Sequence, residues 1–158
     1  MRRNITVLNR QTRVPVDGEK IRRAAGRILD RLGYKGYELT VLVVDDQEIT
    51  RLNRRYFRRN RPTNVISFPM MEETSLSLPA KVLGDVVISA DTAKRDAGEV
   101  GKRAGEEILF LLTHGILHLA GYDHEATKKE RLEMEAKEKE LFVRLKAPSR
   151  RRSLISRK

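Results

Sequence analysis

The three histidines of this chain all fall within one short stretch, His-Gly-Ile-Leu-His-Leu-Ala-Gly-Tyr-Asp-His, at positions His114, His118 and His124. His114 and His118 are four residues apart, so a helix would place both rings on one face, one turn apart. Gly121 follows at a position where a helix can end in a left-handed residue, after which the chain can turn back. We therefore expect the three imidazoles to converge on one point.

This histidine pattern predicts a metal site. Three neutral nitrogen ligands leave one position of a tetrahedral zinc ion open, which is typical of catalytic rather than structural zinc. The chain has no cysteine, so a thiolate site and a disulfide framework are both excluded. The spacing also matches the long motif of zinc peptidases, but those enzymes carry a glutamate general base directly after the first histidine, where this chain has Gly115. The pattern thus favours one Zn²⁺ per chain and argues against a peptidase.

The residues before and within the motif indicate how it is held. Residues 106–119 are apolar nearly all round, which predicts a buried central helix. Gly115 inside that helix costs about 1 kcal/mol relative to alanine, and a close-packed neighbour or a ligand would explain the cost. The last helix is expected to direct inward the residues Leu132, Met134 or Glu135, Leu141, Phe142 and Leu145.

The remaining periodicity predicts four strands, at residues 4–9, 37–44, 65–68 and 84–89. Helices are expected at about 17–32, 45–56, 89–100 and 126–145, with Asp91 or Ser89 capping the third of these. Such an order predicts one α+β (α/β-like) domain over residues 1–147, with a four-stranded mixed sheet packed with helices. The metal would lie on the central helix and the turn after it. A loop is expected from Pro69 to Lys81.

The charge of the chain favours a polyanionic partner. Its formal net charge is +11, and nucleic acid is the first candidate for such a protein. Six of the cationic residues lie in 145–158, which contain no acid, and residues 148–158 are expected to form a disordered basic tail. The alternative is a solubilising charge spread evenly over the surface.

A second basic cluster occupies residues 54–64, which hold five arginines and no acid. Pro62 prevents a helix from continuing through this stretch. Because arginine forks match phosphate geometry, Arg58, Arg59 and Arg61 are candidate contacts for an RNA backbone. A solvated loop is the alternative, since a run of charge alone is weak evidence.

No stretch approaches the length of an apolar membrane span, so we expect no membrane partner. The lack of cysteine fits a cytoplasmic location.

Three segments of the chain resemble the bacterial YbeY family of metal-dependent endoribonucleases that mature ribosomal RNA. Residues 114–124 nearly reproduce the family signature, and residues 53–69, with the core Pro-Thr-Asn-Val-Ile-Ser-Phe-Pro, form the second match. The third match is Leu-Gly-Asp-Val-Val-Ile-Ser at residues 83–89. The likeness extends over about residues 1–145 and leaves the tail outside it.

The resemblance implies a zincin-like fold, a zinc ion on His114, His118 and His124, and cleavage of single-stranded RNA. It further implies a role in 16S rRNA 3′-end maturation and ribosome quality control. The implied partners are ribosomal RNA and the small ribosomal subunit, with a small-subunit ribosomal protein as a further candidate. One departure stands out. Members often carry an arginine, thought to matter for activity, where this chain has Phe57, and Arg58 is the neighbouring candidate to replace it.

The sequence does not identify a general base. Asp123 adjoins a predicted ligand and is a candidate to orient its ring from the second shell, whereas Asp85 is expected near a strand start or in a turn. Two other function classes therefore stay open at this point. One is a different metal-dependent hydrolase, such as a peptidase, and the other is a ribosome-assembly factor that binds without catalysis.

Overall fold

Four strands form one mixed sheet in the computed structural model, which describes residues 4–70, 81–122 and 127–146. The strands are β1 (Ile5–Asn9), β2 (Glu38–Val44), β3 (Val65–Pro69) and β4 (Val82–Ser89). Their order in the sheet is β1-β2-β4-β3, with β1, β2 and β4 parallel and β3 antiparallel to β4. The four predicted strands and the mixed sheet are confirmed, and β3 forms one edge.

The described helices are α1 (Gly18–Leu32), α2 (Asp46–Phe57), α4 (Ala90–Glu99), α5 (Ala104–Leu119) and α6 (Lys128–Lys146). Side-chain caps set three of their starts: Asp17 accepts a hydrogen bond from the amide of Lys20, Asp45 from that of Glu48, and Ser89 from that of Thr92. Of the two caps considered for α4, Ser89 is therefore the one used. Helix α1 ends at Gly33, which adopts a left-handed φ of +86°.

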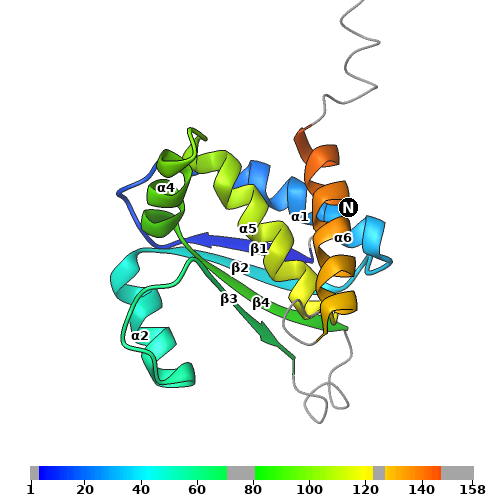
Figure 1. Cartoon of the computed structure of the whole chain (residues 1–158), viewed down its shortest axis with the longest axis horizontal. Helices are drawn as coiled ribbons and strands as arrows, with labels where there is room; N and C mark the ends of the chain where they lie inside the picture. Colours follow the sequence, from blue (N-terminus) through cyan, green and yellow to red (C-terminus); the bar gives the residue numbers. More distant parts are fainter. Residues whose placement is uncertain (1–3, 71–80, 123–126, 147–158) are drawn as a thin grey trace, which may run out of the picture.

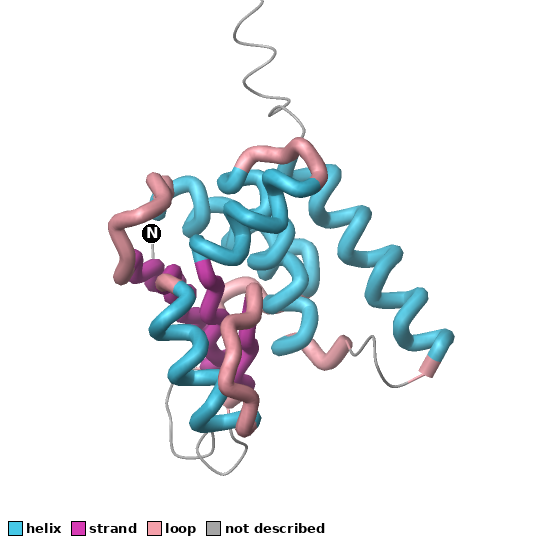
Figure 2. Tube along the Cα trace, turned by 60° about the vertical axis from the view of Figure 1, so that its left-hand side comes forward, coloured by secondary structure: helices cyan, strands magenta, loops and turns pink. Residues whose placement is uncertain are grey.

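Helices cover both faces of the sheet, and two apolar cores result (Figures 1 and 2). Helices α1 and α5 pack on one face and form the main core with the strands, and α6 packs outside them against α5. Helix α2 covers part of the opposite face and forms a smaller core from Val44, Ile49, Ile66 and Val87. The end of β2 is buried on both sides, because Val43 belongs to the main core and Val44 to the smaller one.

Helix α5 is the central helix that the apolar sequence predicts, and a glycine lets it approach the sheet closely. A Cβ atom on Gly115 would lie 2.7 Å from Cγ1 of Val86 in β4 and 3.2 Å from Oγ of Ser67 in β3. A side chain fits there only if the side chain of Val86 shifts, because ordinary contacts are longer. The close-packed neighbour expected from the sequence is therefore present, and it brings the histidine-bearing turns of α5 onto β3 and β4.

The inward face of α6 matches the prediction at Met134 and Leu141 and differs from it at Leu132 and Glu138. Leu132 is 50% exposed, whereas Met134, Glu138 and Leu141 are buried. These three positions are four and three residues apart, so they lie on one helical face, and Leu132 lies off it. Phe142 and Leu145 pack against the main core as expected.

Most of the predicted loop between Pro69 and Lys81 and the predicted basic tail at 148–158 fall outside the described residues. Within the described ranges, no helix combines the length and apolar character needed to cross a membrane.

Candidate metal centre

The first two predicted ligands lie on one face of the last turns of α5. Nε2 of His114 and Nε2 of His118 are 3.2 Å apart. Their ring centres are 4.7 Å apart with the ring planes at 70°. The rings therefore meet at their Nε2 atoms.

This separation is the one that a shared metal ion requires. Zinc–nitrogen bonds of about 2.0–2.1 Å in a tetrahedral site hold two ligand nitrogens about 3.3 Å apart. The two histidines therefore fit zinc by donor type and by spacing. Sequence spacing predicts that two rings share a face, but the structure adds that their Nε2 atoms point at one another.

A buried carboxylate approaches the other nitrogen of the first histidine. The carboxylate of Glu138 on α6 contacts Nδ1 of His114, and Glu138 is only 8% exposed. An ionised carboxylate can only accept, so the contact favours the His114 tautomer with its proton on Nδ1 and a lone pair on Nε2. Metal-binding histidines are commonly oriented by such a partner.

Glu138 is not among the predicted site residues, although the pattern of α6 contains a signal for it. Glu138 lies four residues after Met134 and three before Leu141, so an acid occupies an inward position of an otherwise apolar face. A buried acid in that place needs a partner, and His114 provides one.

The predicted third ligand, His124, and the predicted second-shell Asp123 lie outside the described residues. The turn that leads to them is visible: α5 ends at Leu119, and Gly121 adopts φ +100°. The amide of Tyr122 donates to the carbonyl of Leu117. The left-handed glycine expected from the sequence is therefore present. Among the described residues, no set of three side chains is arranged to hold a metal.

Edge strand β3 runs beside the histidine pair. Oγ of Ser67 donates a hydrogen bond of 2.8 Å to the carbonyl of Gly115, one residue after His114. Because side chains alternate along a strand, Phe68 points to the opposite face, where it joins the smaller core under α2. Strand β3, which is an edge strand among the described residues, thus lies between the histidines and the α2 side of the sheet.

Asp85 lies within β4, as the predicted strand at residues 84–89 requires, and the alternative of a turn is wrong. It pairs with Phe68 and Thr40 and lines a hollow of about 350 Å³ with Tyr56 and Val87, on the α2 side of the sheet. Its carboxyl group is accessible, but apolar neighbours partly dehydrate it, and this burial raises its pKa. Because α5 packs on the other face, Asp85 is not placed to serve as a base beside the histidines.

The candidate RNA contacts Arg58, Arg59 and Arg61 follow the end of α2, and all three are exposed. Arg58 caps the helix at φ +58° and is the only described residue other than glycine with positive φ. The buried amide of Asn53 fixes the loop by donating to the carbonyl of Arg61 at 2.9 Å.

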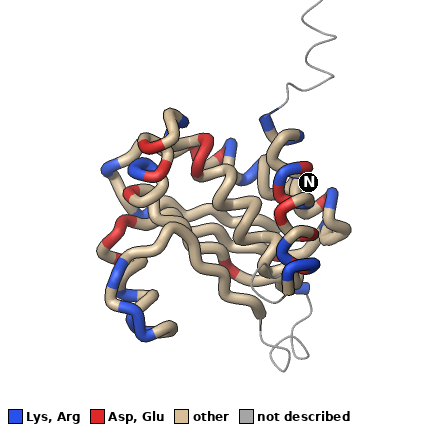
Figure 3. The backbone as a smooth tube through the Cα atoms, viewed as in Figure 1, with Lys and Arg blue, Asp and Glu red and all other residues tan. Residues whose placement is uncertain are grey.

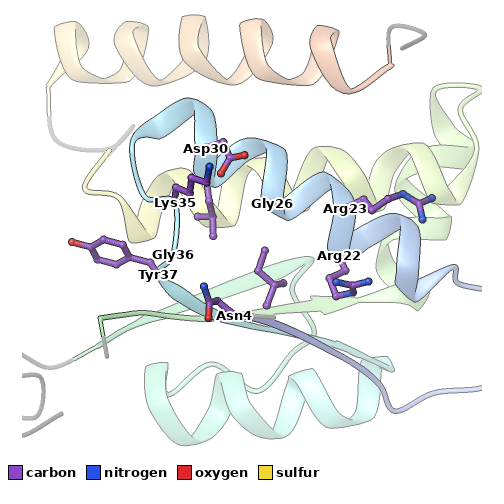
Figure 4. Close-up of a pocket in the computed structure, with 10 residues that line it drawn as sticks. Asn4, Arg22, Arg23, Gly26, Asp30, Lys35, Gly36 and Tyr37 are labelled. Carbon is purple, nitrogen blue, oxygen red and sulfur yellow. The ribbon is translucent and has the colours of Figure 1, made fainter. Parts of the chain in front are cut away.

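A larger hollow of about 390 Å³ lies at the opposite edge of the sheet, between α1 and β1 (Figure 4). Arg22, Arg23 and Lys35 contribute to its lining, but Arg22 and Arg23 both pair with Glu19. Neither His114 nor His118 lines this hollow. The hollow lies at the β1 edge of the sheet, whereas the histidine pair lies beside β3 at the opposite edge.

Comparison with known proteins identifies the kind of enzyme to which this site belongs. A family model described as endoribonuclease YbeY matches residues 6–146. Endoribonuclease YbeY of Geobacter metallireducens is 49% identical over 140 residues, covering 88% of this chain and 93% of the relative. The Syntrophotalea carbinolica protein of the same name is 48% identical, covering 90% and 95%.

The fold is also known from a solved relative. The solution structure of TM1509 from Thermotoga maritima matches with a TM-score of 0.62 and 30% identity, covering 89% of this chain and 88% of that one. Together these matches place the chain among the endoribonucleases, hydrolases that cut RNA within the strand. More particularly, the chain belongs to the YbeY family, whose members are metal-dependent and act in ribosomal RNA processing.

Proposed function

We propose that this chain is a zinc-dependent endoribonuclease specific for single-stranded RNA, with His114, His118 and His124 as the metal ligands. The main support is the 3.2 Å separation of the two Nε2 atoms of His114 and His118. The contact between Glu138 and Nδ1 of His114 adds to it, because it favours the proton on Nδ1 and the ring lone pair on Nε2, the atom that faces His118.

When bound, zinc supplies Lewis-acid chemistry, since it polarises a phosphoryl oxygen and activates water at neutral pH. The chain's own residues position the reactants. Glu138 holds the His114 ring, and Arg58, Arg59 and Arg61 bind phosphates along the RNA and neutralise their charge. The general base is not assigned to any residue.

The proposed biological role is maturation of the 3′ end of 16S rRNA and ribosome quality control, in the cytoplasm and on the small ribosomal subunit. A small-subunit ribosomal protein is a candidate partner. The net charge of +11 favours attraction to such an RNA-rich particle.

A digestion panel tests the activity. Full-length wild type and His114→Ala, each with its zinc content and melting temperature measured, are incubated with single-stranded RNA, duplex RNA and an unstructured peptide. We expect wild type to cut only the single-stranded RNA and His114→Ala to cut nothing. Peptide cleavage would instead indicate a peptidase, and a zinc-loaded protein that binds small subunits without cutting RNA would indicate an assembly factor.

The arginine assignment has a separate test, which uses the salt dependence of RNA binding. Replacing Arg58, Arg59 and Arg61 together with alanine should weaken binding and flatten the dependence of log K on log salt, because fewer counterions are released. An unchanged slope would assign these residues to a solvated loop.

A further inference from the structure

Three aromatic side chains meet where α2 ends against β3, and we name Tyr56, Phe57 and Phe68 the aromatic surface. The ring centre of Phe68 lies 5.1 Å from that of Tyr56, edge to face, and 6.4 Å from that of Phe57, nearly parallel. Tyr56 and Phe57 are 54% and 49% exposed. All eight aromatic residues of the chain lie in the described ranges, and only these two are exposed.

The aromatic surface lies within the arginine cluster. No acidic residue occurs between Glu48 and Glu72, and the arginines gather at the end of α2 (Figure 3). The guanidinium carbon of Arg55 is 5.4 Å from the ring centre of Tyr56. Exposed aromatic rings among arginines are the combination that proteins use for single-stranded nucleic acids, since rings stack on bases while cations follow the phosphates.

The position of the aromatic surface connects it to the histidine pair. Phe68 and Ser67 are neighbours on β3, and Ser67 contacts the turn of α5 that carries His114. On its other side β3 has no strand partner among the described residues. A flexible single strand that passes this edge can therefore contact both places, whereas the bases of a duplex are already paired and stacked on one another.

We propose that Tyr56, Phe57 and Phe68 form a base-stacking surface that selects unpaired RNA for the histidine site, an inference that rests on the proposed RNA hydrolase function. Phosphates bind to the surrounding arginines, and unpaired bases stack on the exposed rings. Phe57 has no role if only the arginines contact RNA. In this proposal its role is to stack on a base. Two acids, Glu48 and Asp85, line the hollow beside Tyr56 and Phe68. An apolar protein partner still fits less well, because the chain around Tyr56 and Phe57 carries five arginines in residues 54–64.

Binding measurements that distinguish the contribution of the bases from that of the phosphates test this inference. The full-length double variant Tyr56→Leu/Phe57→Leu keeps apolar contacts to Phe68 but loses the rings, and Val100→Ala, an exposed apolar change elsewhere, is the matched control. Each protein is titrated with a labelled single-stranded RNA and with an abasic strand of the same length. Melting temperatures verify that each variant is folded.

The double variant should bind the single-stranded RNA at least tenfold more weakly, given typical stacking contributions. Its affinity for the abasic strand and its salt slope should match wild type, as should all values for Val100→Ala. Equal affinity of double variant and wild type for the RNA overturns the inference, and so does an equal loss on both strands. If RNA binding depends on the rings but wild type cuts no RNA, the proposed hydrolase function fails while the stacking surface stands.

Discussion

The carboxylate of Glu138 on α6 faces Nδ1 of His114 on α5, so a helix that follows the histidine motif in sequence returns to orient its first ring. The contact is mostly shielded from solvent, with side-chain exposures of 23% for His114 and 11% for Glu138. It fixes the ring whose Nε2 atom meets Nε2 of His118.

Removing this carboxylate should weaken metal binding. We expect Glu138→Ala to lower zinc affinity about 10–100-fold, because the His114 ring loses the acceptor that orients it. Glu138→Gln should lose less, since an amide oxygen still accepts from Nδ1–H. Zinc affinity is measured by competition with a chelator, and the tautomer of His114 by ¹⁵N NMR.

Glu135→Gln is the matched control for this prediction, because Glu135 is exposed on the same helix. It should leave zinc affinity unchanged. If Glu138→Ala melts at a lower temperature but binds zinc as tightly as wild type, Glu138 only stabilises the fold.

A methyl group at Gly115 should destabilise the protein although alanine is the better helix former. Overpacking against Val86 costs about 1–3 kcal/mol, against a gain of about 1 kcal/mol from helix propensity. Gly105 in the same helix has open space around it, so Gly105→Ala should be neutral or stabilising. Chemical denaturation checks both, and adding Val86→Ala should restore part of the loss in Gly115→Ala. If the Gly115→Ala protein is as stable as the Gly105→Ala protein, the side chain of Val86 moves away from the added methyl group without loss of stability.

Arg58 combines a strained backbone with an exposed cation. Mutation should separate the effect of the backbone on stability from the effect of the charge on RNA binding. Left-handed backbone costs a non-glycine residue about 1–2 kcal/mol. Arg58→Gly should therefore raise the free energy of unfolding by up to about 1 kcal/mol while weakening RNA binding. Arg59→Gly should bring no such gain in stability, since Arg59 is not left-handed. Stabilisation with unchanged RNA affinity would remove Arg58 from the RNA contacts.

The anchoring of α2 to α4 should depend on pH. Burial acts to raise the pKa of Asp46, but hydrogen bonds from Thr92, Arg95 and Ser89 outweigh it and hold the pKa below its ordinary value. Its stabilising contribution is thus complete above the unfolded pKa of about 3.9 and is lost as pH falls through the lower folded pKa.

Asp46→Asn should accordingly cost about 1 kcal/mol at neutral pH, a modest value because Arg95 is exposed and solvent screens its charge. Melting temperatures of variant and wild type should converge as pH falls below about 4. Asp30→Asn, an exposed change on α1, is the control. A difference that grows toward acid pH would contradict the assigned direction of the pKa shift.

Local signals in the sequence predict the elements well. Capping by Asp17 and Asp45 and the left-handed Gly33 and Gly121 are decided within a few residues, and the structure has each of them. The cost of Gly115 correctly indicated a close neighbour, although only the structure identifies Val86.

Relations between distant segments were not predictable in the same way. The edge position of β3 depends on which strands pair, and the orientation of Asp85 depends on the register of β4. For α6, Leu132 was expected inward and is exposed, while Glu138 is inward. A buried acid is acceptable there only because His114 lies opposite it. The pattern of α6 indicates that the acid needs a partner, but it does not identify His114 as that partner.

The most direct test of the account is the zinc content of the full-length protein with one ligand removed. Elemental analysis after metal loading and gel filtration should give about one zinc per chain for wild type, as the proposed three-histidine site requires. His118→Ala, verified as folded by its melting curve, should retain well under half of that amount, whereas Glu135→Gln should retain all of it. Undiminished zinc in a folded His118→Ala protein would contradict the metal centre and the mechanism built on it.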